Sequence, residues 1–593
     1  MPITLLQAIK RVLQNGVSTI DDLFSLNVRC KMVDDMDDEV IRHIVDNSLP
    51  PDEDVFSFEP EEDGCAFDLG NDVLPLEAIL DKGQSNLHTT VDKPKEEQTP
   101  RHDFISEEIL HALKANEDGD AWLYIEAHCG RFAYDYSTDQ WHYWKGHYWH
   151  EDTSERAMAA IKVVIDVYRQ EAGRQSQQRT QAERAGQTAI AQQHKAHEGA
   201  LSKRIQALQG VKRKTNVLKL ASIVSTKYGY KSLALTGREW DQNPMLLGCR
   251  NGVIDLETGI HRPGKSEDWI KTITPTEWQG TDAPAPTWER FLNEIFGNNA
   301  ELIAYVQRLF GYAITGKTTQ DIFPMLYGQG RNGKGTLLET LRYVLGGLAG
   351  PIEAEMLLAH RWTRQSEGPT SDIMSLRGKR LVWASETQGD RHLDTGRVKW
   401  LTGGDTLTGQ APHGKRQVSL KSTHKLFLLT NHKPHAPAHD YGFWKRLQLI
   451  PFTFSFADNP QKDNERKADK GLPEKLRAEA SGILAWLVRG CLEWQEKGLR
   501  QAETVKWATK EYRESEDDIG RFIKSDCVTG PEYSTKFKGL YDAFELYCAE
   551  TGSSVPNQKV FGQYLRRRFG EPRRKATGFW YIGIGLNRVK DGP

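Results

Sequence analysis

The feature that most constrains the fold is a glycine-rich turn within residues 325–341, MLYGQGRNGKGTLLETL. A short apolar strand, residues 322–327, precedes the turn, and apolar residues at helical spacing follow it. In a strand, glycine loop and helix arrangement, backbone N–H groups and the positive end of the helix dipole bind phosphate, and a lysine adds a cation. The segment therefore predicts a P-loop in an α/β fold, with ATP and magnesium as cofactors.

Each part of the loop has a predicted task. Lys334 supplies a compact cation to the β and γ phosphates, and the glycines let the backbone approach them without intervening side chains. The usual Ser or Thr directly after the lysine is replaced by Gly335, so the hydroxyl of Thr336 is the candidate magnesium ligand. The predicted nucleotide-binding residues are Gly328, Gly330, Asn332, Gly333, Lys334, Gly335 and Thr336.

Three further segments supply candidate catalytic residues. The apolar strand LVWASE ends at Glu386, a carboxylate suited to holding magnesium and polarising water. A second apolar strand, KLFLLTN, ends at Asn431, which can orient the attacking water or sense the γ phosphate. Arg446 stands just before the apolar run LQLIPF and can serve as an arginine finger across a subunit boundary.

The order GQGRNGKGT, RLVWASE, KWLTGGDTLTG, LFLLTN and FWKRLQLIPF resembles the motifs of superfamily 3 helicases, specifically the phage, plasmid and poxvirus primase-helicase group. These motifs cover about residues 290–455, and LLGCRNGVIDLETG together with the tryptophan-rich hairpins of residues 131–150 extends the resemblance to roughly residue 105. The resemblance implies an AAA+-type ATPase that forms a hexameric ring and translocates along DNA. By position, Lys334 binds phosphate, Glu386 is the acidic motor residue, Asn431 the sensor and Arg446 the finger. The family often has two adjacent acids where this chain has Ser385 and Glu386.

Two basic segments are candidate DNA contacts. Residues 405–431 predict a hairpin with a cationic tip, and the resemblance implies that this hairpin projects into the channel of the ring. Apolar residues at helical spacing from Phe537 to Cys548 and from Val560 to Phe569, followed by a two-stranded segment that ends in FWYIGIGL, form a pattern typical of a winged helix. Residues 555–593 carry 9 basic and 2 acidic residues. The candidates are His413, Lys415 and Arg416 in the hairpin, and Lys559, Arg566, Arg567, Arg573 and Arg574 near the C-terminus.

Charge divides the chain into an acidic head and a basic body. The first 100 residues carry 22 Asp or Glu and 8 Lys or Arg, whereas the remainder carries 59 acidic and 70 basic residues. A basic body fits a polyanion, while the head would more readily meet protein, such as a separate primase. The head is too short and too acidic for a primase domain and shows no zinc cysteines. In the whole chain, scattered cysteines and the lack of a long apolar run favour a cytoplasmic protein with no membrane segment.

We therefore expect an α/β protein with an AAA+-like P-loop ATPase core, an α+β domain before it, a helical subdomain and a C-terminal winged helix. The expected segments are an acidic, mostly helical unit (1–80), a linker (81–103), the α+β domain (104–285), the motor (286–455), the helical subdomain (456–515) and the winged helix (516–593). A Gln-rich stretch within 168–200 is expected to be solvent-facing helix, and His142, His147 and His150 are expected to pack rather than bind metal.

The favoured function is an ATP-driven replicative DNA helicase of a phage or mobile element. One alternative is a primase-helicase in which Asp255 and Glu257 are catalytic, although Asp-Leu-Glu-Thr-Gly is also an ordinary turn at the end of a strand. A second is an origin-binding initiator whose ATPase reshapes an assembly.

Overall fold

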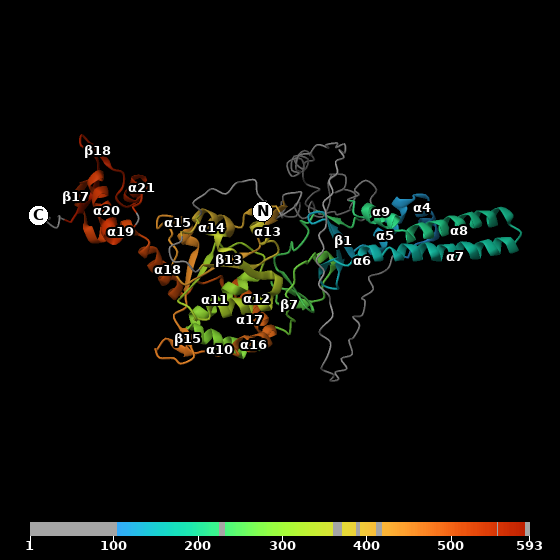
Figure 1. Ribbon diagram of the computed structural model, residues 1–593, viewed down its shortest axis with the longest axis horizontal. Helices are drawn as coiled ribbons and strands as arrows, with labels where there is room; N and C mark the ends of the chain where they lie inside the picture. Colours follow the sequence, from blue (N-terminus) through green and yellow to red (C-terminus); the bar gives the residue numbers. More distant parts are fainter. Residues whose placement is uncertain are drawn as a thin grey trace, which may run out of the picture. The chain divides into compact units, whose positions relative to one another are not determined.

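The computed structural model describes residues 103–223, 232–359, 371–386, 392–410, 418–553 and 555–587. Contacts divide the chain into Met1–Lys93 and Pro94–Pro593, and every described residue belongs to the second unit (Figure 1). The predicted acidic unit, nearly all of the linker and the hairpin tip with His413, Lys415 and Arg416 lie outside the described residues. The finer domain boundaries stay predictions.

A helical region with its own buried apolar core precedes the motor. Its largest part is a hairpin of two long helices, α7 (Lys162–Arg184) and α8 (Thr188–Gln209) (Figure 1). The helical prediction for this stretch is confirmed. The other helices are α4 (Ser106–Lys114), α5 (Glu117–His128), α6 (Arg156–Ala159) and α9 (Val211–Ala221).

The hairpin is joined by a polar seam as well as by apolar contacts. The fully buried carboxylate of Glu171 accepts hydrogen bonds from Gln175 Nε2 at 2.7 Å and from Ser106 Oγ at 2.8 Å. The Gln175 side-chain oxygen lies 2.7 Å from Nδ1 of His194 on α8. The Gln-rich stretch is thus solvent-facing on one side only, because its other side is the contact between the two helices.

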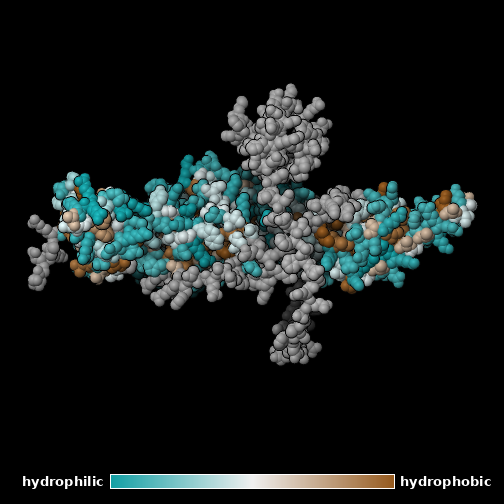
Figure 2. Space-filling model, turned by 90° about the horizontal axis from the view of Figure 1, so that it is seen from above, coloured by the Kyte–Doolittle hydropathy of each residue, from teal (hydrophilic) through white to brown (hydrophobic). Residues whose placement is uncertain are grey.

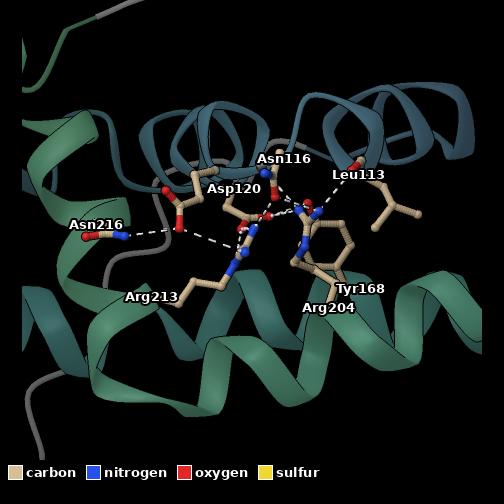
Figure 3. A network of polar contacts seen from close by, with 8 residues as sticks. Leu113, Asn116, Asp120, Tyr168, Arg204, Arg213 and Asn216 are labelled. Atoms are coloured by element: carbon tan, nitrogen blue, oxygen red, sulfur yellow. Dashed lines mark hydrogen bonds and ion pairs between the residues drawn. The ribbon is translucent and has the colours of Figure 1, made fainter.

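A second polar network ties α5 to the hairpin and to α9 (Figure 3). Asp120 is fully buried, and its two carboxylate oxygens accept hydrogen bonds from Arg204 at 2.7 Å and Arg213 at 2.6 Å. The hydroxyl of Tyr168 donates a third, at 2.7 Å. Such a buried charge is tolerated because partners on three other segments satisfy it.

Two small sheets are formed by segments that precede the motor in the sequence. The first is an antiparallel meander of three strands between α5 and α6, joined by a parallel fourth strand that follows α9, and His142 is buried within it. The second is an antiparallel sheet of three strands that also follows α9. Their strands are β1 (Phe132–Asp135), β2 (Gln140–Trp144), β3 (Trp149–Glu151) and β4 (Ala234–Leu235), then β5 (Leu246–Cys249), β6 (Gly252–Asp255) and β7 (Ile260–Arg262); the short 3₁₀ helix η1 (Ser266–Asp268) follows.

The motor is built on a five-stranded sheet with the order β14-β8-β13-β10-β9, in which every pairing is parallel. Continuous apolar runs form these strands because helices cover both faces of a parallel sheet. The stacked rings of Phe310 and Phe427, 5.2 Å apart, join a covering helix to the central strand. The strands are β8 (Phe323–Tyr327), β9 (Ala349–Ile352), β10 (Leu381–Glu386), β13 (Lys425–Thr430) and β14 (Leu447–Pro451).

Helices and two short strand pairs surround this sheet. The helix expected after the P-loop is present, and its apolar residues at helical spacing are all buried: Leu337, Leu338, Leu341, Val344 and Leu345. The segment expected to be a helical subdomain begins instead with a strand pair, β15 (Ser455–Ala457) and β16 (Glu465–Lys467), before its helices. The other elements are α10 (Pro286–Ile295), α11 (Ala300–Ala313), α12 (Lys334–Leu345), η2 (Gly346–Leu348), η3 (Ala354–Met356), α13 (Ser371–Met374), α14 (Thr395–Thr402), β11 (Thr406–Gly409), β12 (Val418–Lys421), α15 (Tyr441–Arg446), α16 (Leu472–Ala478), α17 (Ala480–Lys497) and α18 (Glu503–Ser515).

The C-terminal module has a separate apolar core. Both predicted helices and the strand FWYIGIGL are present, and a further strand makes a three-stranded antiparallel sheet with the order β17-β19-β18. The elements are α19 (Asp518–Asp526), β17 (Cys527–Lys536), α20 (Phe537–Thr551), α21 (Gln558–Phe569), β18 (Arg573–Lys575) and β19 (Gly578–Leu586).

Hydrophilic residues dominate the coloured face in Figure 2. Within the described residues, no helix combines the length and apolar character needed to cross a membrane. In the same part of the chain, no group of three or more His, Cys, Asp and Glu side chains is arranged to hold a metal ion.

Removing the Asp120 carboxylate should loosen the helical region. Asp120→Ala leaves Arg204 and Arg213 without their shared acceptor, and breaking a buried pair typically costs about 3 to 5 kcal/mol. Amide hydrogen exchange in α8 and α9 should therefore accelerate by roughly 100-fold or more. Asp166→Ala removes an exposed pair with Arg169 on α7 and is the matched control. Equal exchange in the two variants would contradict the role given to Asp120.

Candidate active site

Three strands of the motor sheet end in one row. Tyr327 at the end of β8 pairs with Thr430 at the end of β13, and Thr430 pairs with Glu386 at the end of β10. The P-loop, Asn431 and Glu386 therefore meet at the carboxyl edge of the sheet. The side chain of Glu386 lies outside the described residues, so its task stays a prediction.

The P-loop follows β8 directly and needs glycine at two of its positions. Gly333, which precedes α12, has φ of 87°, and a Cβ there would lie 2.6 Å from Ile295. A Cβ on Gly328 would lie 2.3 Å from the carbonyl oxygen of Phe452. Both positions exclude larger residues, by backbone conformation in one case and by close approach in the other.

Lys334 is the first residue of α12, and its side chain turns back under the loop. Its ammonium group donates hydrogen bonds to the carbonyl oxygen of Gly328 and, at 3.1 Å, to Oδ1 of Asn431. Burial lowers the pKa of Lys334 to about 8, because desolvation disfavours the charged form. The structure thus brings together two of the four predicted catalytic residues, Lys334 and Asn431.

Two cavities flank the loop. The first, about 280 Å³, is lined by Gly330, Arg331, Asn332, Lys334, Gly335, Ser385, Leu429, Thr430 and Asn431. The second, about 360 Å³, is lined by Phe291, Arg331, Gly333, Thr336, Phe456, Asp458, Ala468, Asp469, Lys470 and Leu472. Arg331 borders both cavities. The predicted magnesium ligand Thr336 lines the second cavity, whereas the Lys334 side chain lines the first.

The cavities also contain residues that sequence reasoning did not select. Ser385 adds a hydroxyl to the first cavity beside Glu386, and Phe291 and Phe456 add two aromatic rings to the second. Ser385 could have been found from its place beside the predicted carboxylate. Phe291 and Phe456 come from segments far from the loop in sequence, and only the fold brings them to it.

Arg446 lies at the amino ends of the strands, opposite the carboxyl ends where the P-loop is. It immediately precedes β14, whose Leu447 pairs with Phe323 at the start of β8, while the P-loop follows the end of β8. The two edges are four residue steps apart, about 13 Å along the strands. The guanidinium donates to Asp321 Oδ2 and to the carbonyl oxygen of Gly442, each at 3.0 Å.

The segment between Asn431 and α15 is fastened to α18 and to the residue after it. The hydroxyl of Tyr512 donates to the carbonyl oxygen of Pro434, and the backbone N–H of Ala436 donates to Glu516 at 3.1 Å. The ammonium of Lys433 lies 5.3 Å from the ring centre of Tyr327 at the end of β8. The position of Asn431 is thus linked to the helix that leads into the C-terminal module.

The structure places the C-terminal DNA candidates on the surface. Arg573 and Arg574 are exposed on β18, and Lys559 is exposed on α21. Arg566 pairs with Glu571 at 3.4 Å, and Arg567 donates to the carbonyl oxygen of His439 at 3.3 Å. In the motor, β11 and β12 pair as the predicted antiparallel hairpin, although its tip is not described.

Asp255 and Glu257 form a turn at the end of β6. The backbone N–H of Glu257 donates to Asp255 Oδ1 at 2.8 Å, and the Glu257 carboxylate lies 3.9 Å from the ammonium of Lys317. These contacts agree with the ordinary turn.

Comparison with known proteins gives two domain matches. Residues 123–297 match the family described as D5 N terminal like. Residues 326–446 match a family of unknown function, DUF5906, and this range contains Lys334, Glu386, Asn431 and Arg446.

Similar proteins occur in large DNA viruses. A "Putative helicase" of Acanthamoeba polyphaga mimivirus is 30% identical over 356 residues, which cover 57% of this chain and 37% of the viral protein. A "Putative primase" of African swine fever virus is 27% identical over 50% of this chain and 32% of its own length. A "Putative helicase" of Invertebrate iridescent virus 3 is 22% identical over 62% of this chain and 41% of its own length. The chain thus spans well under half the length of these relatives.

Among solved structures, the A form apo structure of the NrS-1 C terminal region is 15% identical and covers 63% of this chain and 90% of its own, with a TM-score of 0.37. The sequence matches are the stronger finding. They show that this chain carries a D5 N terminal like domain and a DUF5906 domain, as found in the primase-helicase proteins of phages and viruses.

Proposed function

We propose that this protein is an ATP-dependent replicative DNA helicase of a phage, virus or mobile element, which acts in the host cytoplasm as a ring of identical subunits. The observation that carries the proposal is the position of the Lys334 ammonium. It lies between the P-loop carbonyl of Gly328 and the amide of Asn431, at the edge where β10 also ends. A cation in this place can exchange its two neutral acceptors for phosphate oxygens.

The two cavities divide the nucleotide between them. We place the phosphate groups in the cavity of Lys334, whose lining includes the Ser385 hydroxyl. Glu386, the next residue, ends β10 and is the proposed magnesium ligand. The base and ribose occupy the second cavity, where Phe291 and Phe456 offer aromatic surface and two carboxylates offer hydrogen-bond acceptors. Thr336 lines this second cavity, so a metal role for Thr336 requires its hydroxyl to reach the phosphates across the start of α12.

The location of Arg446 supports a site shared between subunits. An arginine about 13 Å away along the sheet is too distant to stabilise charge on the phosphates of its own chain. The same edge on a neighbouring copy can face those phosphates, and a closed ring presents one such contact at every interface. A hexamer is the ring that the resemblance implies.

DNA binding is assigned to the motor hairpin and to the C-terminal module. The order α19, β17, α20, α21, β18 and β19 supports a winged helix, with α21 and the β18–β19 hairpin as the DNA-facing parts. Lys559, Arg566, Arg573 and Arg574 contact phosphates there, and Arg567 is shared with the motor. A separate primase would be recruited through the acidic first 80 residues.

The deciding experiment is strand displacement from a forked duplex. Wild-type protein should hydrolyse ATP and separate the strands, and Lys334→Ala should lose both activities, with ATPase falling by roughly 100-fold or more. ATP hydrolysis without strand separation would favour the origin-binding initiator. Ribonucleotide incorporation that disappears when Asp255 and Glu257 become alanine would favour the primase-helicase.

ATP binding should weaken at alkaline pH. Lys334 with a pKa of about 8 is mostly protonated at pH 7 and mostly neutral at pH 9, while bound phosphate requires the charged form. The Kd should therefore rise by about tenfold between pH 7 and pH 9, measured by calorimetry. Lys334→Arg keeps its charge throughout this range, so its Kd should stay nearly constant. A wild-type Kd that does not change over the same range would show that Lys334 does not bind the phosphates.

Mixed subunits should reveal the shared site. Arg446→Ala should bind ATP normally and lose turnover by roughly 1000-fold or more, because a finger acts mainly in the transition state. Mixing it with Lys334→Ala subunits should restore part of the activity, since some interfaces then combine an intact Lys334 with an intact Arg446. Failure to recover ATPase at every mixing ratio, with assembly verified by ultracentrifugation, would rule out a finger supplied by the neighbour.

A further inference from the structure

The β18–β19 hairpin carries an exposed aromatic side chain among cationic residues. Phe579 is 53% exposed and pairs in register with Arg574, and all three residues of β18 are exposed. Residues 555–587 contain seven Lys or Arg and a single carboxylate, Glu571, which pairs with Arg566. An apolar ring on so cationic a surface fits a partner that offers both negative charge and flat rings.

The hairpin has a defined geometry around Phe579. The ammonium of Lys575 lies 4.5 Å from the ring centre of Trp580, and the Trp580 indole N–H donates to Thr577 Oγ1 at 3.1 Å. Gly578, with φ of 120°, permits the turn between the strands. These contacts hold the tip in one arrangement, so that Phe579 is presented on a fixed strand.

Strand alternation fixes the side from which Phe579 projects. Tyr581, two residues further along β19, lies on the same face, is buried and donates to the carbonyl oxygen of Gly562 on α21 at 3.1 Å. Phe579 therefore continues the face of the hairpin that packs on α21, but lies beyond the packed core. Arg574, paired with Phe579, shares this face.

We propose that Phe579 stacks on the first unpaired base at a junction between duplex and single-stranded DNA, while Arg573 and Arg574 hold the adjoining phosphates. Inside a duplex each base face is covered by its neighbours, so an aromatic ring can reach a base face only where pairing ends. The β18–β19 hairpin thereby contacts the DNA at the point where the two strands separate. This inference rests on the DNA binding in the proposed function, but not on ATP turnover.

A double-mutant cycle that combines a substitution in the protein with one in the DNA isolates the contact between Phe579 and the base. The affinity of the full-length protein is measured for a fork and for the same fork with an abasic site at the first unpaired position. Phe579→Ala and the abasic substitution should each weaken binding by about 5- to 100-fold, and combining them should add little. Phe579→Trp should restore binding to the intact fork, and an abasic site three nucleotides further out should leave the effect of Phe579→Ala unchanged.

Two controls separate stacking from charge and from general damage. Arg573→Ala with Arg574→Ala should flatten the salt dependence of binding, whereas Phe579→Ala should leave that dependence unchanged. Leu546→Ala alters another exposed apolar residue of the same module, 63% exposed on α20, and should change neither property.

Fully additive effects of Phe579→Ala and the abasic site would overturn the stacking contact, even with DNA binding intact. Loss of binding to vesicles of anionic lipid in Phe579→Ala, with fork binding unchanged, would assign the tip to a membrane surface instead. A wild-type protein that binds neither fork nor single strand would overturn the DNA-binding function as well.

Discussion

The parallel register of β8, β13 and β10 is the constraint on which the candidate site depends. It places Tyr327, Thr430 and Glu386 in one row, so that three chain segments separated by up to about a hundred residues leave the sheet side by side. A shift of one residue in β13 would turn its side chains to the other face of the sheet and displace Asn431 from the Lys334 ammonium. The apolar residues buried in these strands therefore determine the geometry of the polar residues that follow them.

Local sequence patterns predicted the elements of this arrangement but not its contacts. Apolar runs located β8, β10, β13 and β14 but not β9, and helical spacing located α12, α20 and α21, because these signals depend on burial along one segment. The contact between Lys334 and Asn431 depends on pairing between distant strands, and the aromatic lining by Phe291 and Phe456 depends on packing around the loop. Neither contact produces a recognisable pattern within a short stretch of sequence. The same limit explains why Thr336 was selected by its spacing from the lysine, although it lines the other cavity.

Lys334 and Arg446 have different electrostatic environments. Lys334 has neutral acceptors and loses solvation, which lowers its pKa, whereas Arg446 has a carboxylate partner in Asp321. An anionic ligand is favoured beside Lys334 because its two hydrogen-bond acceptors there, the Gly328 carbonyl oxygen and the Asn431 amide oxygen, are neutral. At the other end of the strands, Asp321 and the carbonyl oxygen of Gly442 hold the Arg446 guanidinium in place.

The polar seam of the α7–α8 hairpin has a consequence for its pairing. Apolar helix faces can slide past one another at small cost, but the side-chain oxygen of Gln175 on α7 lies 2.7 Å from Nδ1 of His194 and 3.3 Å from Nδ1 of His197 on α8. Sliding by one turn would separate the buried Gln175 side chain from both histidines, so this contact favours a single alignment of the two helices. This alignment sets how far the turn between α7 and α8 extends from the rest of the domain.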